Sequence, residues 1–306
     1  MTEDEQDALA SIRLAYEDLE RWRARSRGVE RPEPGSELAG DEAVWPYLDP
    51  AEVARQSLVS ATQHLNLARA AIEAGEVFPT AHFSVLRGAL VGGSMAVWVL
   101  GPDAAVDRQQ RALRVVEEFY KRALQYHDDI RPHVDVSHPD AAQWLDSGEH
   151  MRRRRAEARA RWSAADGLKE GQALEMTSIV RVVSEFVFTP REALNVRLLW
   201  RQLSGDAHAL TWQLVGRSSH AQHVGGGMAE FAAGGDLVEL ADVFGKVFSL
   251  TKRGWSLFDR RCEGERPVLG GHCVFAVTLA VTLSLETTMA WSEHRSDQAF
   301  RRADRI

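Results

Sequence analysis

The chain has 306 residues, of which 44% are hydrophobic and 26% are charged, and its formal net charge at pH 7 is -7. These values are typical of globular domains and exclude a disordered chain, while the negative charge argues against a broad nucleic-acid-binding surface. The cysteines, Cys262 and Cys273, form no CxxC pair, so the sequence predicts neither a disulfide framework nor a structural zinc site.

Residues 2–27 carry apolar side chains every three or four positions, which places them along one face of a helix: Ala8, Ile12, Ala15, Leu19 and Trp22. We expect this face to pack against the protein's own core, with a dimer contact as the alternative. Prolines and glycines among charged residues predict a loop over 28–48. The predicted organisation is therefore an N-terminal helix with a linker, 1–48, and one helical domain, 49–306.

Two helix starts are marked by a capping residue, a proline and a glutamate, beginning at Asp49 and at Thr189. They predict helices over 50–74 and 190–217. Further helices are predicted over 80–100, 103–129, 139–166, 236–263 and 268–300, with a glycine-rich connection before 236. The apolar run 178–189 fits a helix or a strand. The predicted fold is an all-α bundle of about eight helices.

The location of the protein is predicted from its most apolar segments. The chain begins with the acidic sequence MTEDEQDALA, whereas a secretory signal begins with basic residues followed by an apolar core. The stretches 88–101 and 273–285 are shorter than the roughly 20 residues that span a bilayer. We therefore expect buried core helices and a cytoplasmic protein without membrane contact.

An arginine, Arg87, stands at the start of the first apolar stretch. A guanidinium keeps its charge at all ordinary pH values, and an unpaired buried charge is very costly. Arg87 therefore needs a carboxylate, carbonyl groups or a ligand anion. Structural pairing is the favoured interpretation, and a clamp for a ligand such as phosphate is the alternative.

The segment LWRQLSGDAHALTWQL, 199–214, contains Arg201 and His208 with Ser204 and Asp206 between them. In an unbroken helix the arginine and the histidine would share one face, roughly 10 Å apart. If Ser204 or Asp206 instead capped a new helix, His208 would lie near free backbone N–H groups that attract anions. Either arrangement would suit a phosphate. Comparable spacings recur in the chain, but this pair lies in a long, capped segment with apolar neighbours: Leu198, Leu199, Leu203, Leu210 and Trp212.

This segment resembles the HEPN superfamily, whose ribonuclease members carry an arginine, four to six intervening residues and a histidine. The resemblance implies a helical homodimer that cleaves RNA through the RNA's own 2′-hydroxyl, without a metal. In that mechanism His208 would be the acid or base, and Arg201 would hold the phosphate. Gln202 departs from the pattern, because asparagine or aspartate often follows the arginine in those enzymes.

A looser resemblance, over about 80–215, is to helical bacterial families of the DUF5677 kind. It rests on the segments SVLRGALVGGSMAVWVL, DRQQRALRVVEEFYKRAL and LSGDAH. In that comparison an acidic residue often follows the first arginine by one helical turn, where this chain has Val91 and Gly92. Such a resemblance implies a fold more than a function.

The segment QYHDDIRPHVDVSHPD contains several possible metal ligands. His127 and Asp128 resemble the pair that names the HD phosphohydrolases, and His133 with Asp135 resembles the facial triad of iron oxygenases. The oxygenase motif lies on barrel strands, which this sequence does not predict, and a polar loop between two helices explains the same residues. The nearby run RRRR, 152–155, fits either an RNA-binding or acidic-partner surface, or a solvated helix face.

Taken together, these patterns favour a helical interaction or oligomerising module, with an unknown partner and a homodimer as one arrangement. A HEPN-like endoribonuclease is the main alternative; its site residues would be Arg201, His208, Ser204 and Asp206. A metal-dependent HD-like phosphohydrolase using His127 and Asp128 is the third hypothesis. No cofactor is predicted.

Overall fold

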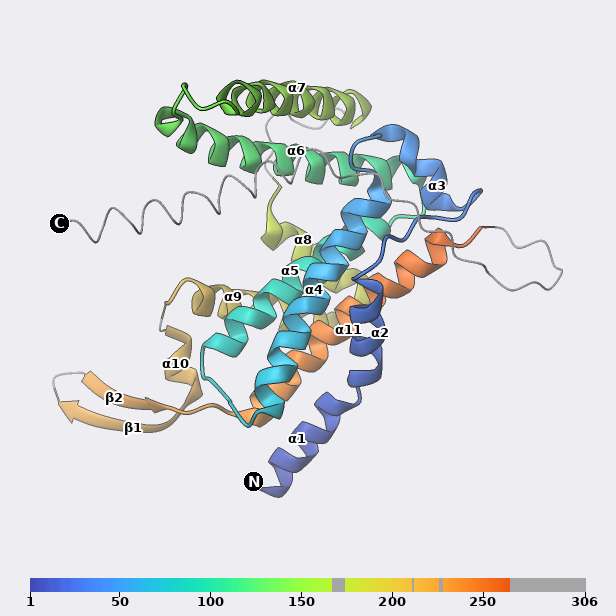
Figure 1. Ribbon diagram of the computed structural model, residues 1–306. Coiled ribbons are helices and arrows are strands. Elements are labelled where there is room, and N and C mark those ends of the chain that lie inside the picture. The colour runs from blue at the N-terminus through green and yellow to red at the C-terminus, as the bar shows by residue number, and fades with distance from the viewer. Residues whose placement is uncertain (167–173, 211, 226–227, 265–306) are drawn as a thin grey trace. The chain divides into compact units, whose positions relative to one another are not determined.

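The computed structural model describes residues 1–166, 174–210, 212–225 and 228–264, and it confirms an all-α, multi-helix fold (Figure 1). The predicted helix over 268–300 lies outside the described residues. The long helices are α4 (Pro50–Glu73), α5 (Ala81–Leu100), α6 (Ala105–Ile130), α7 (Ala141–Asp166), α9 (Pro190–Ala207) and α11 (Leu237–Cys262). The shorter ones are α1 (Glu3–Arg13), α2 (Tyr16–Arg25), α3 (Glu37–Asp41), α8 (Met176–Val187) and α10 (Trp212–Arg217), with 3-10 turns η1 (Glu42–Val44) and η2 (Arg131–His133).

The sequence expectation of a glycine-rich connection before 236 differs from the structure. The chain there forms an antiparallel hairpin of two strands, β1 (Ser218–Gly225) and β2 (Met228–Ala233). Residues 218–225 lack the alternation of apolar and polar side chains that marks a half-buried strand, so the sequence did not reveal it. Gly225 at the end of β1 pairs with Met228 at the start of β2.

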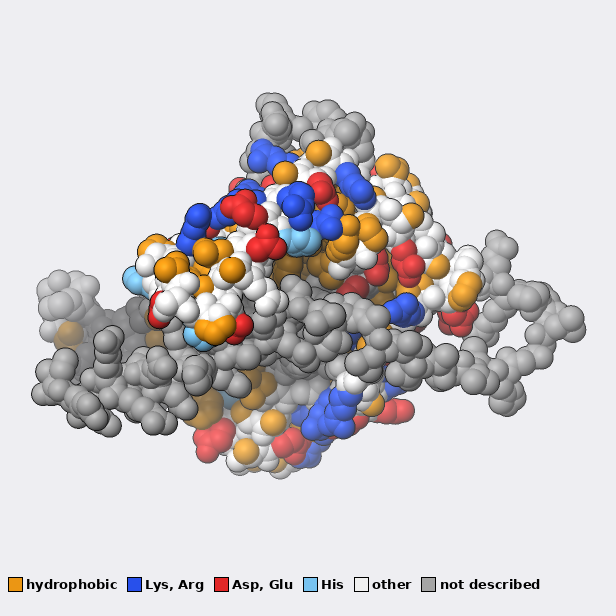
Figure 2. Space-filling model, turned by 45° about the horizontal axis from the view of Figure 1, so that its top comes forward, with side chains coloured by type: hydrophobic (Ala, Val, Ile, Leu, Met, Phe, Trp, Pro, Cys, Tyr) orange, Lys and Arg blue, Asp and Glu red, His pale blue; other side chains and the backbone are white. Residues whose placement is uncertain are grey.

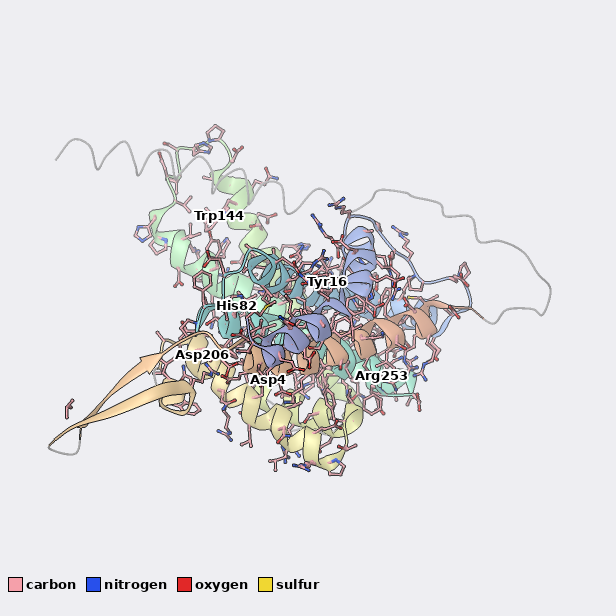
Figure 3. The ribbon with its side chains drawn as sticks, turned by 90° about the horizontal axis from the view of Figure 1, so that it is seen from below. Asp4, Tyr16, His82, Trp144, Asp206 and Arg253 are labelled. Carbon is pink, nitrogen blue, oxygen red and sulfur yellow. The ribbon has the colours of Figure 1, made fainter. Side chains whose placement is uncertain are left out.

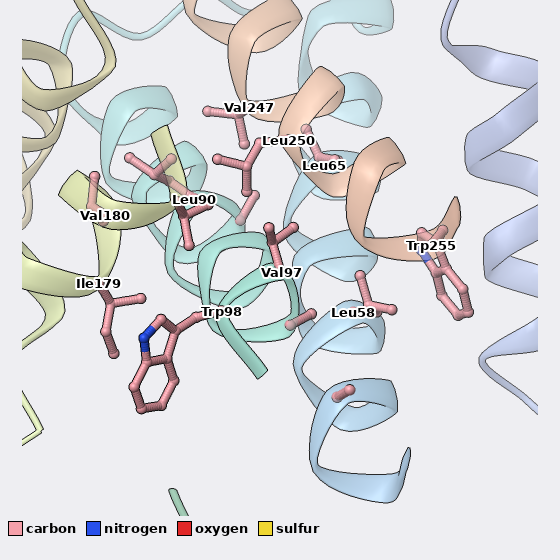
Figure 4. Packing of buried hydrophobic residues seen from close by; sticks show 14 of the residues in the cluster. Leu58, Leu65, Leu90, Val97, Trp98, Ile179, Val180, Val247, Leu250 and Trp255 are labelled. Carbon is pink, nitrogen blue, oxygen red and sulfur yellow. The ribbon is translucent and has the colours of Figure 1, made fainter. Parts of the chain in front are cut away.

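Helices α4, α5 and α11 form the centre of the core, where Leu58 and Leu65 meet apolar side chains of the other two helices (Figure 4). Glycines on α5 allow this close approach. A Cβ atom at Gly92 would lie 2.5 Å from the carbonyl oxygen of Ser57 on α4, and one at Gly93 would lie 2.6 Å from Leu250 on α11. Because both distances are too short for a real contact, hydrogen is the only side chain that fits at these positions.

Helix α5 contains the first apolar stretch noted in the sequence. Among the described residues it is the one helix long and apolar enough to cross a membrane, and 67% of its most apolar 18-residue stretch is buried inside the protein. Its buried side chains include Leu86, Leu90 and Val97, which belong to the main hydrophobic cluster. This burial fits the expected core helix.

The predicted N-terminal helix is divided into α1 and α2 by a tight turn at Leu14 and Ala15. Its apolar face packs against the protein's own core, as expected, because all five of its residues are buried: Ala8, Ile12, Ala15, Leu19 and Trp22. The indole of Trp22 stacks on that of Trp255 on α11, with ring centres 6.1 Å apart.

The segment 28–48 is more ordered than the predicted loop. It contains α3, which is capped by the Ser36 side chain, and the turn η1. Leu38 and Trp45 are buried in the same cluster as the side chains of α4, α5 and α11. In the described residues, 1–48 therefore shares one core with the rest of the chain.

A buried ionic cluster fixes α3 to the ends of α5, α6 and α11. Arg108 and Asp41 are almost fully buried, and the Arg108 Nε donates to an Asp41 carboxylate oxygen at 2.7 Å. Arg261 is also buried, and its Nε donates to the Leu100 carbonyl oxygen at 2.7 Å. A second nitrogen of Arg261 lies 3.0 Å from the Asp103 carboxylate. These contacts explain why a segment rich in proline and glycine is held in place.

The helix starts were predicted unequally well. The side chains of Asp49 and Thr189 accept hydrogen bonds from the first turns of α4 and α9, as expected. The predicted helices over 80–100 and 103–129 correspond to α5 and α6, and the residues that precede them, Thr80 and Ala104, make no side-chain capping hydrogen bond. The ambiguous run 178–189 is mostly helical, within α8.

The contact between α1, α2 and the end of α4 predicts a dependence of stability on pH. The Glu73 carboxylate accepts from Arg13 at 2.9 Å and from the Tyr16 hydroxyl at 2.6 Å, and the Arg13 hydrogen bond is the main reason that its pKa falls from 4.5 to about 2. The contribution of ionised Glu73 to the stability of the fold is therefore complete above pH 4.5 and is lost as the pH falls through about 2. Glu73→Gln should lower the urea midpoint at pH 7, by a difference that disappears at the lowest pH. A difference that is the same at both pH values would contradict this role.

Candidate functional site

The helix that begins at Pro190 ends at Ala207, ten residues before the predicted end at 217. The His208 N–H bonds to the Ser204 and Gly205 carbonyl oxygens at 3.2 Å, and Ala209 takes a positive φ of 55° that stops the helix. His208 therefore lies at a helix C-terminus, in neither of the two predicted arrangements. The carbonyl end of a helix carries partial negative charge, so it does not itself attract a phosphate.

The Arg201 and His208 side chains are both exposed, near the C-terminal end of α9. Within the described ranges neither side chain makes a hydrogen bond or an ion pair with another residue. Three of the apolar neighbours noted in the sequence are also exposed rather than buried: Leu198, Leu210 and Trp212. This end of α9 is therefore a surface, with its charged and apolar groups available to a partner.

Asp206, in contrast, is part of the internal framework. Its fully buried carboxylate accepts from Arg217 at 2.9 and 3.0 Å and from the Gln213 amide at 2.7 Å. The Arg217 guanidinium also lies 3.7 Å from the centre of the Phe83 ring on α5 and bonds to Glu239 on α11 at 2.9 Å. Asp206 thus joins α9 to α5, α10 and α11, and its carboxylate is committed to Arg217 and Gln213 rather than to a substrate.

Ser204 accepts a hydrogen bond from Arg87, at 3.3 Å from its Nε. The guanidinium of this half-buried arginine lies 4.9 Å from the centre of the Trp200 ring. No carboxylate oxygen of the described residues lies within 4 Å of it, so the structure differs from the favoured expectation of an ion pair. The aromatic face and the remaining access to solvent take the place of a carboxylate.

A groove between α8 and α9 was not expected from the sequence. It is a half-open pocket of about 300 Å³ lined by Thr177, Ser178, Val180, Arg181, Leu194, Arg197, Leu198, Trp200 and Arg201. The buried side chains of Val180 and Trp200 form its apolar base, and the Trp200 Nε1 donates to the Thr177 hydroxyl at 3.1 Å. Leu194 and Leu198 are 47% and 52% exposed beside it.

The charge of this groove is positive. Arg197 is bonded to Glu185 on α8 at 3.1 Å, but Arg181 and Arg201 have no carboxylate within 4 Å in the part of the chain that the structure describes. Arg181 comes from α8 and Arg201 from α9, so cations line both helices around an apolar base. This combination suits an anionic group attached to an apolar body.

The predicted metal ligands His127 and Asp128 are occupied by other contacts. The His127 ring stacks on Trp144 of α7 with centres 3.8 Å apart, and its Nε2 donates to the Trp144 carbonyl oxygen at 3.1 Å. Asp128 is paired with Arg152. In the described residues no three histidine, cysteine or acidic side chains meet as a metal site would require. Figure 3 shows Trp144 on the α6–α7 hairpin, well away from Asp206 on α9.

The arginine run on α7 is largely used within the hairpin. Arg152 bonds to Glu149 at 2.6 Å, Arg154 bonds to Glu157 at 2.8 Å, and Arg155 lies 3.7 Å from Glu117 on α6. Figure 2 shows acidic and basic side chains mixed over the face that carries this hairpin. The run is therefore balanced by acidic partners and does not form an uninterrupted basic surface.

Comparison of the chain with protein-family models, curated proteins and solved structures finds no match. The function is therefore inferred from the geometry of the chain itself. Among the described residues, two exposed features carry the functional argument: the arginine-lined groove between α8 and α9, and the Arg201–His208 pair at the end of α9.

Proposed function

We propose that the protein is a helical interaction module that binds an acidic, amphipathic helix of a partner protein in the groove between α8 and α9. The observation that carries the proposal is the groove itself. Its base is apolar, two leucines are half exposed beside it, and its arginines come from both helices. An amphipathic helix lies in such a groove with its apolar side chains inward.

Charge complementarity selects an acidic partner. When a partner covers the groove, Arg181 and Arg201 lose water, and a desolvated cation without a counter-charge is costly. The chain itself supplies no carboxylate within 4 Å of either group among the described residues, so the partner has to supply them. Leu194 and Leu198 then provide the apolar contact, and the arginines determine which partner is accepted.

The test uses two synthetic helical peptides with the same leucine spacing. One peptide carries glutamates on its polar face, and the other carries lysines. We expect the glutamate peptide alone to bind in a fluorescence anisotropy titration, with an affinity that falls as salt is added. Leu198→Glu should weaken binding by about tenfold or more. Leu67→Glu, at a residue of α4 that is 58% exposed, is the matched control and should bind normally.

Three results would contradict the proposal. The first is equal binding of the two peptides, and the second is an equal loss of affinity in the Leu67→Glu control. The third is self-association: if sedimentation shows a dimer that Leu198→Glu dissociates, a second copy of the chain occupies the groove instead of an acidic partner.

A HEPN-like, metal-independent ribonuclease is a second candidate, favoured by the exposure of Arg201 and His208 and by their lack of partners in the described chain. The buried pairing of Asp206 restricts the reacting groups to this pair and Ser204. RNA cleavage in the presence of a chelator, abolished in His208→Ala, would support the enzyme. Intact RNA, or cleavage that His208→Ala retains, would remove this candidate.

A further inference from the structure

Within the described part of the chain, Arg111 and Arg114 on α6 lack the carboxylate partner that most of the buried and half-buried arginines have. Most of the others pair with carboxylates, as do Arg25, Arg55, Arg108, Arg217 and Arg261. Arg111 and Arg114 are half-buried, and no carboxylate oxygen of the described residues lies within 4 Å of either. Their positive charges are therefore unbalanced at short range.

Both guanidinium groups lie against the same tryptophan. The Arg111 and Arg114 guanidinium carbons are 5.3 and 5.6 Å from the centre of the Trp98 ring. Arg111 is held there by a hydrogen bond of 2.7 Å that it donates to the Trp98 carbonyl oxygen, and Arg114 is also 5.7 Å from the Trp162 ring of α7. Residues three apart on a helix are neighbours, so both cations lie at Trp98, near the end of α5.

This arrangement is electrostatically unfavourable for the chain alone. Desolvation is the main cause that lowers the pKa of Arg111, and the charge of Arg114 lowers it further, against the opposing effect of the Asp107 carboxylate. Like charges this close repel each other, most strongly where water is partly excluded. A bound anion would remove the repulsion.

We propose that Arg111 and Arg114 bind a phosphate group beside Trp98. Two guanidinium groups require about two negative charges, and a phosphate monoester carries about -1.5 to -2 near pH 7, whereas one carboxylate carries half of that. Guanidinium groups also match phosphate oxygens through paired hydrogen bonds. The site uses none of the residues that line the α8–α9 groove, so it does not depend on the proposed function.

The experiment is calorimetric titration of the full chain with inorganic phosphate, and with acetate at the same ionic strength. Phosphate should bind more tightly than acetate, and its affinity should fall between pH 7.5 and 5 as the dianion takes up a proton and loses its second charge. Arg111→Gln and Arg114→Gln should each weaken phosphate binding about tenfold or more. Arg122→Gln, on the same helix and paired with Glu118, is the control and should bind phosphate normally.

Thermal unfolding provides the independent readout. Without phosphate, Arg114→Gln should melt at the same temperature as the parent or higher, because one of two repelling charges is removed. Added phosphate should raise the melting temperature of the parent and leave that of the variant unchanged. The proposal is overturned if the parent does not bind phosphate, if the glutamine variants bind it equally well, or if Arg114→Gln melts well below the parent in phosphate-free buffer.

Discussion

Replacing Asp41 with alanine is expected to lower the free energy of unfolding by about 3–5 kcal/mol, a large part of the stability of a typical domain. The reason is the buried cation that remains. Asp41 and Arg108 have side-chain exposures of only 1% and 2%, and Asp41 also accepts from the Gln109 amide at 3.1 Å. Glu37 lies 2.9 Å from Arg108 but is 46% exposed, so it cannot compensate for the lost carboxylate.

Urea unfolding followed by circular dichroism would measure this effect. Glu42→Ala is the matched control, because it removes an exposed carboxylate from the next residue of the chain and should change the stability by about 0.5 kcal/mol or less. If Asp41→Ala and Glu42→Ala cost the same, the buried pair does not stabilise this end of the core, and α3 is held by its apolar contacts alone.

Replacing Asp206 with alanine is the second substitution for which we expect a large loss of stability, again about 3–5 kcal/mol. It would leave the guanidinium of Arg217, whose side chain is 5% exposed, without the carboxylate that its Nη1 contacts through both oxygens. The contact with Glu239, which is 31% exposed, replaces only part of the lost interaction. The expected consequence is loosening of α10 from α5, α9 and α11.

The comparison variant His208→Ala, two residues later, removes an exposed side chain and should leave the stability unchanged within about 0.5 kcal/mol. The double variant Asp206→Leu, Arg217→Met should be more stable than Asp206→Ala, because no charge remains buried and unpaired. If Asp206→Ala unfolds at the same urea concentration as the parent, the Asp206 carboxylate does not stabilise the fold. Its assigned structural role would then be wrong, and the carboxylate would be available for catalysis.

The sequence predicted those parts of the fold that depend on local interactions. Asp49 and Thr189 cap helices because the groups that they bond lie three residues away, and the N-terminal apolar face is buried because its spacing matches the helical repeat. The end of α9 could not be predicted in the same way. It depends on the positive φ of Ala209 and on the pairing of Asp206 with Arg217, eleven residues apart.

The candidate sites show the same division. The sequence identified Arg87, Arg201, Ser204 and His208 as notable, but it did not indicate that Asp206 is buried or that Arg87 meets Ser204 across 117 residues. The α8–α9 groove was missed because Leu194 and Leu198 have the periodicity of core residues. Their exposure depends on which face of α9 packs against α5 and α8, and a pattern within one helix cannot specify this.

The glycines of α5 have a consequence for movement in this protein. A helix that fits its neighbours only where hydrogens replace side chains cannot slide by even one residue. A shift in one direction would put Val91 in the place of Gly92 against the Ser57 backbone, and a shift in the other would put Ser94 in the place of Gly93 against Leu250. Helices α4 and α5 should therefore behave as one rigid frame. Arg87 on α5 contacts Ser204 and Trp200 of α9. These contacts fix the position of α9 relative to α4 and α5. Any widening of the groove then has to come from movement of α8.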